Sequence, residues 1–208
     1  MELLLEKQVI EPTITEEGQF VSNFFLRPKS QSGKFRLIFK LKTLNEHVRY
    51  ENFKMENMNT ALAMMTKGCY MANIDLKDAY HSVAVRSGDR KFLKMEWKGR
   101  LYQLHALPVG LACAPLVFTR MLKPFLASLR SRGQKSVCYL NDLLLFGNSY
   151  KLCVINVQKT TELLVKVGGV INVSKSNFIP TKEIEFWVLP RIQMICQLHF
   201  QSRRDARH

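Results

Sequence analysis

Two aspartates, one at the end of an apolar segment and one at a turn within another, are candidates for binding metal ions together. Asp75 closes the apolar stretch "MANIDL", and Asp142 follows Asn141 in "VCYLNDLLLFG", residues 137–147. The second stretch is typical of a strand, a tight turn and a strand. If the strands are neighbours in a mixed sheet, the two carboxylates converge, and Mg²⁺ prefers such oxygen ligands. Two ions held there would stabilise the attacking and leaving oxygens of a phosphoryl transfer.

Each of these residues also has an ordinary structural interpretation. Asp75 could cap a helix that begins near Lys77, which is the usual role of an aspartate in that position. Asn141 and Asp142 could simply form a turn. Asn141 offers an oxygen but carries no charge, so the hairpin is a catalytic one, a damaged one or only a turn. Spacing alone favours the helix cap for Asp75.

An excess of basic residues points to a partner with negative charge. The 208 residues include 31 Lys and Arg against 17 Asp and Glu, which gives a net charge of +14. A hydrophobic fraction of 47% is enough for a packed core. Nucleic acid is the commonest partner of such a surface, although a basic surface that serves only solubility explains the charge equally well.

Cysteine usage and hydropathy predict an intracellular protein, in the cytoplasm or the nucleus. The five cysteines form no CxxC pair, which favours buried thiols over disulfides or a zinc site. The first residues are too charged for a signal peptide. No stretch reaches the roughly 20 apolar residues that a membrane span needs.

Periodicity in the first half of the chain predicts short helices and β-hairpins. The expected helices end at turn residues and cover 2–9 and 55–68. The expected strands are bounded by Gly, Pro or polar clusters and cover 20–26, 35–41 and 69–76. Residues 92–107 alternate about a turn at Lys98–Arg100, which predicts a hairpin with Met95 on its apolar face and Lys94 on its polar face.

The second half of the chain adds two helices around the central hairpin. An amphipathic helix is expected over 114–133, kinked at Pro124, and another over 151–167. A strand at 170–173, a loop at 174–182 and a strand at 183–188 should follow. The order strand, helix, strand, strand, helix, strand predicts an α+β fold, with a split βαβ sheet and helices on one face.

These segments resemble successive blocks of the reverse transcriptase domains of retrotransposons, and they occur in the same order as in that family. The resemblance is greatest to DIRS-type elements. The similar blocks run from about Leu3 to Phe186 and read "LLEKQVIEP", "FVSNFFLRPKSQSGKFRLIFKLKTLN", "NIDLKDAYHSVAV", "ALPVGLACAPLVFTRMLKP", "CYLNDLLLFGNS" and "GGVINVSKSNFIPTKEIEF". The resemblance implies right-hand polymerase fingers and palm, with an antiparallel palm sheet backed by helices and no thumb. The fingers would comprise about 1–68 and 91–107, and the palm about 69–90 and 108–186.

The resemblance also implies a set of catalytic residues. Asp75 matches the first metal-binding aspartate, and the main chain of Leu76 would approach the metal. Asp142 matches the second aspartate of a Tyr-x-Asp-Asp turn, and Lys175 resembles the lysine that would protonate departing pyrophosphate. The implied reaction is template-directed transfer of deoxynucleotides to a primer 3′-OH with two Mg²⁺ ions. The implied partners are an RNA or DNA template-primer and dNTPs.

A further set of residues would line the incoming nucleotide by resemblance: Lys29, Arg36, Asp78, Ala79, Tyr80, Pro108, Val109 and Gly110. Lys29 and Arg36 would bind the triphosphate, for which both residue types are suited. Tyr80 resembles the steric gate that excludes a ribose 2′-OH, and Gly110 would let the backbone come close. The structural alternative for Lys29 and Arg36 is a solvated basic ribbon, and for Tyr80 it is an ordinary packed ring.

Two departures from the family pattern predict a damaged enzyme. Asn141 replaces the first aspartate of the turn, so the site loses a negative charge and metal binding should weaken. At 186–189 the chain reads Phe-Trp-Val-Leu where Phe-Leu-Gly-Phe is expected, which the loss of one base can explain. Residues 187–208 are therefore interpreted as a divergent, frameshifted tail without the primer-grip hairpin. The alternatives to an impaired enzyme are an inactive nucleic-acid-binding remnant and a non-functional pseudogene product.

Overall fold

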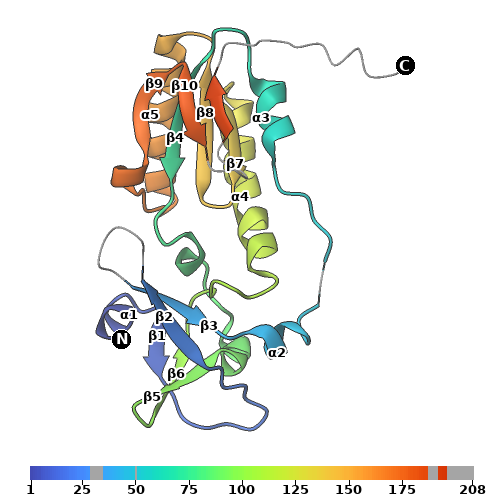
Figure 1. The fold of residues 1–208 in the computed structure, drawn as a ribbon, viewed down its shortest axis with the longest axis vertical. Helices are drawn as coiled ribbons and strands as arrows, with labels where there is room; N and C mark the ends of the chain where they lie inside the picture. Colours follow the sequence, from blue (N-terminus) through green and yellow to red (C-terminus); the bar gives the residue numbers. More distant parts are fainter. Residues whose placement is uncertain (29–34, 50, 187–191, 196–208) are drawn as a thin grey trace. The chain divides into compact units, whose positions relative to one another are not determined.

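Two compact units make up the computed structural model, which describes residues 1–28, 35–49, 51–186 and 192–195 (Figure 1). The first unit contains residues 1–53 and 78–121, and the second contains residues 54–77 and 122–208. Each unit is therefore built from two separate stretches of the chain. The division into fingers and palm remains a prediction from the sequence.

A three-stranded antiparallel sheet and a separate ribbon form the first unit. The sheet has the order β1–β6–β5, with β1 at Ile10–Pro12, β5 at Lys94–Trp97 and β6 at Arg100–Leu104. The ribbon pairs β2, Phe24–Pro28, with β3, Phe35–Phe39. The short helices of this unit are α1 (Glu2–Glu6), α2 (Lys42–Asn45), η1 (Ala79–Ser82) and η2 (Ser87–Phe92).

The β5–β6 hairpin confirms the predicted turn but corrects the predicted polar face. Lys98 and Gly99 both have positive φ, 51° and 71°, as a two-residue hairpin turn requires. Met95 and Lys94 are both fully buried, although the alternation placed Lys94 outside. The Nζ of Lys94 is satisfied instead by the segment that passes over it, because it donates to Ile14 O at 2.8 Å and to Gln19 Oε1 at 3.0 Å.

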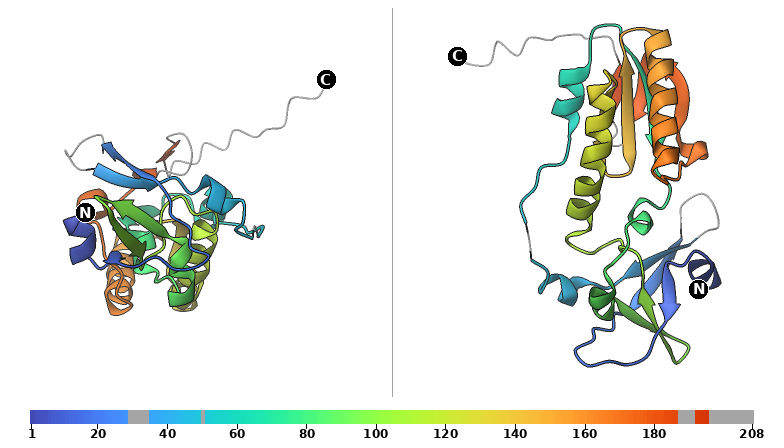
Figure 2. Two further views of the ribbon diagram at one scale, coloured as in Figure 1. Left: turned by 90° about the horizontal axis from the view of Figure 1, so that it is seen from below. Right: turned by 180° about the vertical axis from the view of Figure 1, so that it is seen from behind.

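The second unit is organised around a four-stranded antiparallel sheet with the order β7–β8–β4–β9. Its strands are β4 (Tyr70–Asp75), β7 (Lys135–Tyr139), β8 (Asp142–Gly147) and β9 (Asn177–Thr181). Helix α5 (Tyr150–Lys166) lies on one face of this sheet (Figures 1 and 2). The last residues of helix α4, which as a whole spans Ala114–Ser131, lie on the same face. Pro124 lies inside α4. This arrangement confirms the predicted α+β class.

The two faces of β8 are buried against different partners. Leu144 and Phe146 belong to an apolar cluster with Met71 of β4, Ala61 of α3 (Met58–Met64) and Ile184. Leu143 and Leu145 point to the opposite face, where α5 packs against the sheet. Because side chains alternate along a strand, Asp142 shares the face of Leu144 and not the helix face.

Local capping residues set where the helices of the second unit begin. The side chain of Asn57 accepts from Thr60 N at 3.2 Å, and Asn57 N donates to Thr60 Oγ1 at 3.4 Å. This capping box starts α3 at Met58, later than the sequence predicted. Ser149 likewise caps α5 by accepting from Leu152 N at 3.3 Å.

The outer edge of β7 is closed by an ion pair between Arg130 of α4 and Glu56 of the segment before α3. Arg130 of α4 donates to Ser136 O from Nε at 3.1 Å and from NH2 at 2.7 Å. The same guanidinium donates to Glu56 Oε1 at 2.5 Å, and Glu56 Oε2 accepts from Cys138 N at 2.8 Å. Glu56 and Arg130 thus bond the backbone groups of an edge strand as a neighbouring strand would.

The segment after α5 differs from its prediction. Residues 170–173 form only an isolated bridge, Leu76 with Ile171, and η3 (Val173–Lys175) follows it. The strand β9 lies instead at Asn177–Thr181, where a loop was expected, and it contains Pro180. Proline is tolerated there because β9 is an edge strand of the sheet.

An antiparallel pair also forms near the end of the described chain. Strand β10, Glu183–Phe186, pairs with β11, Ile192–Ile195, in the register Glu183 with Ile195 and Phe186 with Ile192. A strand pair thus spans residue 187, whereas the absence of the family's primer-grip hairpin from that residue on stays a prediction. Residues 187–191 and 196–208, where most of the proposed tail falls, lie outside the described residues. Among the described residues, no helix is long and apolar enough to cross a membrane.

Candidate active site

The turn between β7 and β8 lies one residue earlier than the sequence suggested. Tyr139 pairs with Asp142, so Leu140 and Asn141 form the two-residue loop and Asp142 is the first residue of β8. Leu140 has a φ of 53°, a conformation that residues other than glycine rarely adopt. Such backbone strain concentrates at functional sites, which makes this loop a candidate for one.

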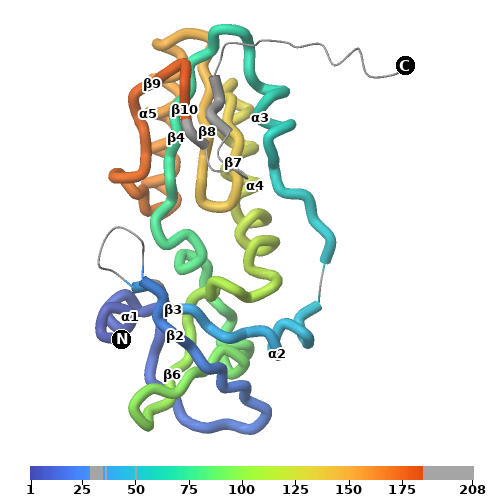
Figure 3. Tube along the Cα trace, in the orientation of Figure 1, coloured from blue at the N-terminus to red at the C-terminus, as the bar shows by residue number. Residues whose placement is uncertain are grey.

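The antiparallel register of β4 and β8 brings the two acidic residues together. Asp75 is the last residue of β4 and pairs directly with Asp142 (the trace of both strands is drawn in Figure 3). Residues paired in this way point to the same face of a sheet. Both carboxylates therefore lie on the face opposite α5, and the predicted convergence of Asp75 and Asp142 is present in the structure.

Two side-chain amides hold the carboxylate of Asp75. Asn141 Nδ2 donates to Asp75 Oδ2 at 2.8 Å, and Asn172 Nδ2 donates to Asp75 Oδ1 at 2.7 Å. The side chain is only 7% exposed, so these charge-assisted bonds replace the water that it loses. The helix-cap interpretation is wrong, because the next helical turn, η1, begins at Ala79 and has Asp78 as its N-cap.

Asp142 is electrostatically strained beside Asp75. Burial, together with the hydrogen bond and the negative charge of Asp75, raises the pKa of Asp142 to about 7. The positive charge of Lys175 lowers the pKa of Asp142 but does not offset these effects. Two neighbouring carboxylates form a place where a cation would be stabilising.

The donor set matches a divalent cation in kind but is short of charge. The carboxylates of Asp75 and Asp142 are hard oxygen ligands. The amide N–H of Asn141 already occupies Asp75 Oδ2, and its own oxygen brings no charge. No group of three or more His, Cys, Asp or Glu side chains able to hold a metal occurs among the described residues. A cation at this site would have to compete with an internal hydrogen bond.

The candidate nucleotide residues that are described lie in the first unit. Tyr80 packs edge to face on Phe118, with ring centroids 5.4 Å apart, and is half-buried. Asp78 has a φ of 50° and accepts from Lys7 Nζ at 2.8 Å. Arg36 lies in β3, in register with Arg27. Ala79 begins η1, and Pro108 and Val109 precede Gly110 in the loop before α4. Lys29 lies outside the described residues.

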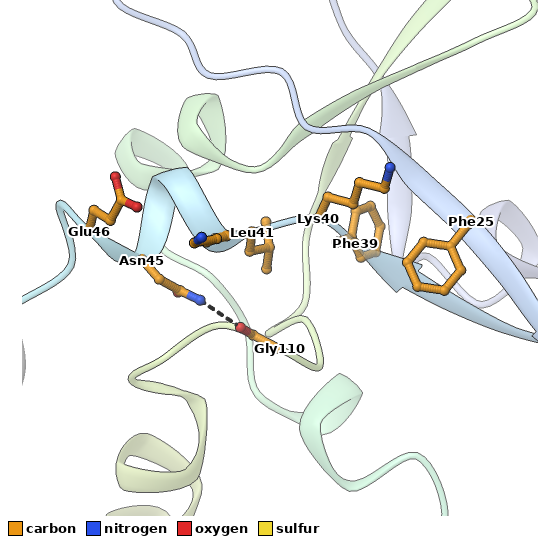
Figure 4. Close-up of a pocket in the computed structure, with 8 residues that line it drawn as sticks. Phe25, Phe39, Lys40, Leu41, Asn45, Glu46 and Gly110 are labelled. Carbon is orange, nitrogen blue, oxygen red and sulfur yellow. Dashed lines mark hydrogen bonds between the residues drawn. The ribbon is translucent and has the colours of Figure 1, made fainter.

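Gly110 borders an open, mainly apolar cavity of about 670 Å³ in the first unit (Figure 4). Phe25 and Phe39 line one end, and Lys40 lies beside them. Asn45 connects α2 to the loop before α4. Its Nδ2 donates to Gly110 O at 2.9 Å, and its Oδ1 accepts from Ala112 N at 2.8 Å. The positive φ of Gly110, 100°, is open to glycine and strained for other residues.

Asn172 and Ser176 contact Asp75 but were not recognised from the sequence. Asn172 bonds its side chain, and Ser176 Oγ accepts from Asp75 N at 3.0 Å. Residues 170–173 were interpreted as a strand, which directed attention away from them. The cluster Asn-Val-Ser-Lys-Ser at 172–176 is rich in residues that bond local backbone, and this was the available signal of a structured loop.

These features are those of a polymerase palm, and the chain belongs to the reverse transcriptase (RNA-dependent DNA polymerase) family, whose profile matches residues 27–188. The Pol polyprotein of the Drosophila melanogaster transposon opus, which is described as retrovirus-related, is 24% identical over 184 residues. The match covers 88% of this chain and 18% of that protein. The Schizosaccharomyces pombe transposon Tf2-3 polyprotein is 26% identical over 151 residues, covering 73% of this chain and 11% of its own length.

Solved structures with the same fold include foamy viral proteins. A foamy viral protease-reverse transcriptase in complex with double-stranded DNA has a TM-score of 0.77 at 18% identity, over 88% of this chain and 31% of that one. The same kind of protein in complex with an RNA/DNA hybrid has a TM-score of 0.72 at 17% identity, over 88% of this chain and 24% of that one. The chain thus spans less than a third of each of these relatives and structures.

Proposed function

We propose that this chain binds a template-primer and deoxynucleotides as the polymerase part of a reverse transcriptase, with a transfer step impaired by Asn141. The observation that carries the proposal is the pairing of Asp75 with Asp142 on one face of the sheet, with Asn141 bonded to Asp75 Oδ2. The carboxylates supply the acidic pair of a nucleotidyl transferase. The amide between them accounts for the impairment, because it supplies a hydrogen atom where the family has a negative charge.

Reverse transcriptases use divalent metal ions, and in this chain Asp75, Asp142 and the backbone carbonyl of Leu76 would hold Mg²⁺. When bound, the ion supplies positive charge to the phosphate oxygens of the reacting groups. The chain's own residues hold these groups in place. Asp75 is fixed by its amide partners, and Asp142 lies on the same face of the sheet. The ammonium group of Lys175, whose positive charge acts on Asp142, would donate a proton to the departing pyrophosphate.

The residues of the first unit would bind the nucleotide. Arg36 and Lys29 would contact the triphosphate, since both types bind phosphate well. Tyr80 would exclude a ribose 2′-OH, because its ring is held in place by Phe118. Asp78, Ala79, Pro108, Val109 and Gly110 would complete the nucleotide pocket through the backbone around η1 and the loop before α4.

Primer extension by the purified chain tests this proposal. Wild-type extension should be very low, and Asn141→Asp should raise it without fully restoring it, because the change returns the missing carboxylate. Asp75→Asn should abolish whatever extension either form shows. Robust Mg²⁺-dependent extension by the unaltered chain would contradict the impairment. Extension that survives Asp75→Asn would contradict the assigned site.

A second candidate function is nucleic-acid binding without catalysis. The net charge of +14 supports binding, and the bonds of Asn141 and Asn172 give the Asp75 carboxylate partners within the protein. In this case the chain binds template-primer, but Asn141→Asp restores no extension. A pseudogene product without a role would show neither. Both candidates are compatible with an intracellular location. The support for it is that no disulfide joins the described cysteines, Cys69, Cys113, Cys138 and Cys153.

A further inference from the structure

Residues 172–176 hold both the backbone and the side chain of Asp75. Asn172 N donates to Asp75 O at 2.8 Å, and Asn172 Nδ2 donates to Asp75 Oδ1 at 2.7 Å. Asp75 N donates to Ser176 Oγ at 3.0 Å. The carbonyl, the N–H and the carboxylate of one residue are thus all bonded to the same short segment.

This segment is braced internally in a way that fixes the orientation of the Asn172 amide. Ser174 Oγ donates to Asn172 Oδ1 at 2.9 Å, and Ser176 Oγ donates to Asn172 O at 2.8 Å. Because a hydroxyl hydrogen is directed at Oδ1, the NH₂ group of Asn172 faces Asp75. The amide is therefore set as a donor to the carboxylate before any ligand arrives.

We propose that Asn172 is a positioning residue that anchors Oδ1 of Asp75 and leaves Oδ2, the oxygen bonded to Asn141, for a cationic ligand. The inference deepens the proposed function and rests on it. Its basis is that the two oxygens of Asp75 have different partners. The partner of Oδ2 is the residue that departs from the family, whereas the partner of Oδ1 belongs to a braced loop.

Burial makes this anchor effective. Asp75 is 7% exposed, and a charge-assisted hydrogen bond is stronger where water is excluded. Without the bond from Asn172, the carboxylate can rotate about its last torsion, which is broad and weakly restrained. Loss of a hydrogen-bonding partner of a metal ligand costs about 10- to 100-fold in metal affinity or activity.

The variants that test the proposal separate hydrogen bonding from shape. Asn172→Ala removes the side chain, whereas Asn172→Leu keeps a similar branched shape but has no group that can donate to Asp75. Asn148→Ala is the matched control, since Asn148 Oδ1 accepts from Thr66 Oγ1 and Lys135 Nζ at the other end of β8. Each change is made in the Asn141→Asp chain. Hydrogen exchange of the Asp75 amide, which Ser176 protects, verifies that the loop remains folded.

The readouts are Mn²⁺ affinity, measured by titration, and primer-extension kinetics. Asn172→Ala and Asn172→Leu should each weaken Mn²⁺ binding about 10- to 100-fold. They should lower kcat by a similar factor and leave KM for the dNTP unchanged, because Asn172 acts only through Asp75. Asn148→Ala should change neither quantity.

Two results would overturn the proposal. The first is an Asn172→Leu chain that binds Mn²⁺ as tightly as its parent, since shape and not donation would then matter. The second is a parent that binds no Mn²⁺, because Asp75 would have no cation toward which to be positioned. A parent that binds Mn²⁺ but extends no primer refutes the proposed function alone, and the Mn²⁺ series still decides the role of Asn172.

Discussion

Asn141 and an aspartate have nearly the same shape, and the difference between them is one charge and two N–H donors. In this chain the donors are used, because Nδ2 bonds to Asp75 Oδ2. An aspartate at 141 would instead add a third carboxylate beside Asp75 and Asp142, which repel each other already. The substitution therefore relieves electrostatic repulsion in the unliganded site while it removes charge that a metal ion would need.

Asp142 predicts a specific dependence of stability on pH. Its pKa in the folded chain, about 7, lies above the unfolded value of 3.8, so the folded state binds the extra proton between about pH 4 and 7. Stability from this group is complete below that window and falls as the pH rises through it. The slope is below the limit of about 1.4 kcal/mol per pH unit for one proton, since Asp142 is partly exposed to solvent.

Denaturant unfolding at pH 5 and pH 8 measures this effect. Asp142→Asn should reduce the loss of stability between the two pH values and raise stability at pH 8. The exposed Glu162→Gln serves as the control and should follow the wild-type curve. An Asp142→Asn chain that loses as much stability as the wild type from pH 5 to pH 8 would refute the assignment.

The buried amine of Lys94 predicts a large stability loss on truncation. Lys94→Met keeps most of the apolar stem but leaves Ile14 O and Gln19 Oε1 without their donor and Glu16 without its ion pair at 2.8 Å. We expect a loss of about 1.5–3 kcal/mol, the range for a hydrogen bond to a charged group, as measured by urea unfolding. The exposed Lys98→Met should cost less than about 0.5 kcal/mol.

At the scale of elements, the sequence predicted long periodic segments and missed a short irregular one. Strands β4 and β8 and helices α4 and α5 were expected close to where they lie, since a continuous apolar run or helical stripe marks each. Strand β9 was taken for a loop, because Pro180 and polar neighbours argue against a central strand and an edge strand tolerates both. The partners of Asp75 in 172–176 were lost with that error.

The burial of Lys94 shows a second limit of sequence reading. Alternation along β5 assigned it to the polar face, and the period of side chains carries no information on what covers that face. Residues 14–19, far away in the chain, provide the carbonyl and the amide oxygen that accept its hydrogen bonds and the carboxylate that pairs with its charge. A contact of this kind depends on tertiary structure, which one strand's pattern cannot reveal.

The ion pair along β7 predicts that Arg130 is important for stability. Arg130→Ala leaves the mostly buried Glu56 without its charge partner and Ser136 O without a donor. We expect a loss of about 3–5 kcal/mol, as for one partner removed from a buried pair, reduced because Arg130 is partly exposed. Arg132→Ala, an exposed arginine close by, is the control for urea unfolding. Equal effects of the two substitutions would contradict the role of the pair.

For the whole molecule, the charge of +14 predicts binding of template-primer with little sequence preference. Each neutralised phosphate releases counterions, so affinity should fall steeply as salt rises. Six phosphate contacts would lose about a thousandfold between 50 and 200 mM salt. Fluorescence anisotropy with an RNA/DNA duplex and two unrelated sequences measures this, and an affinity unchanged over that range would rule out phosphate-dominated binding.

The proposed frameshift near residue 187 can be tested on the nucleotide sequence, without purified protein. If 187–208 are a frameshifted tail, one added base near codon 187 of the nucleotide sequence should restore Phe-Leu-Gly-Phe and an open frame beyond it. The family match, which ends at residue 188, supports this proposal. The pairing of β10 with β11 argues in the other direction, as a shifted frame has no reason to provide a partner strand. The absence of such an alternative frame would refute the frameshift.

The closed edge of β7 also determines how one copy of the chain meets another. A bare edge strand with the sequence Lys-Ser-Val-Cys-Tyr would offer a template to any extended segment, including the same strand of a second molecule. Glu56 and Arg130 occupy the backbone groups that such a segment would use. The pair therefore acts against self-association as well as holding the strand. Chains that lose it should form cross-β aggregates on storage well before they unfold.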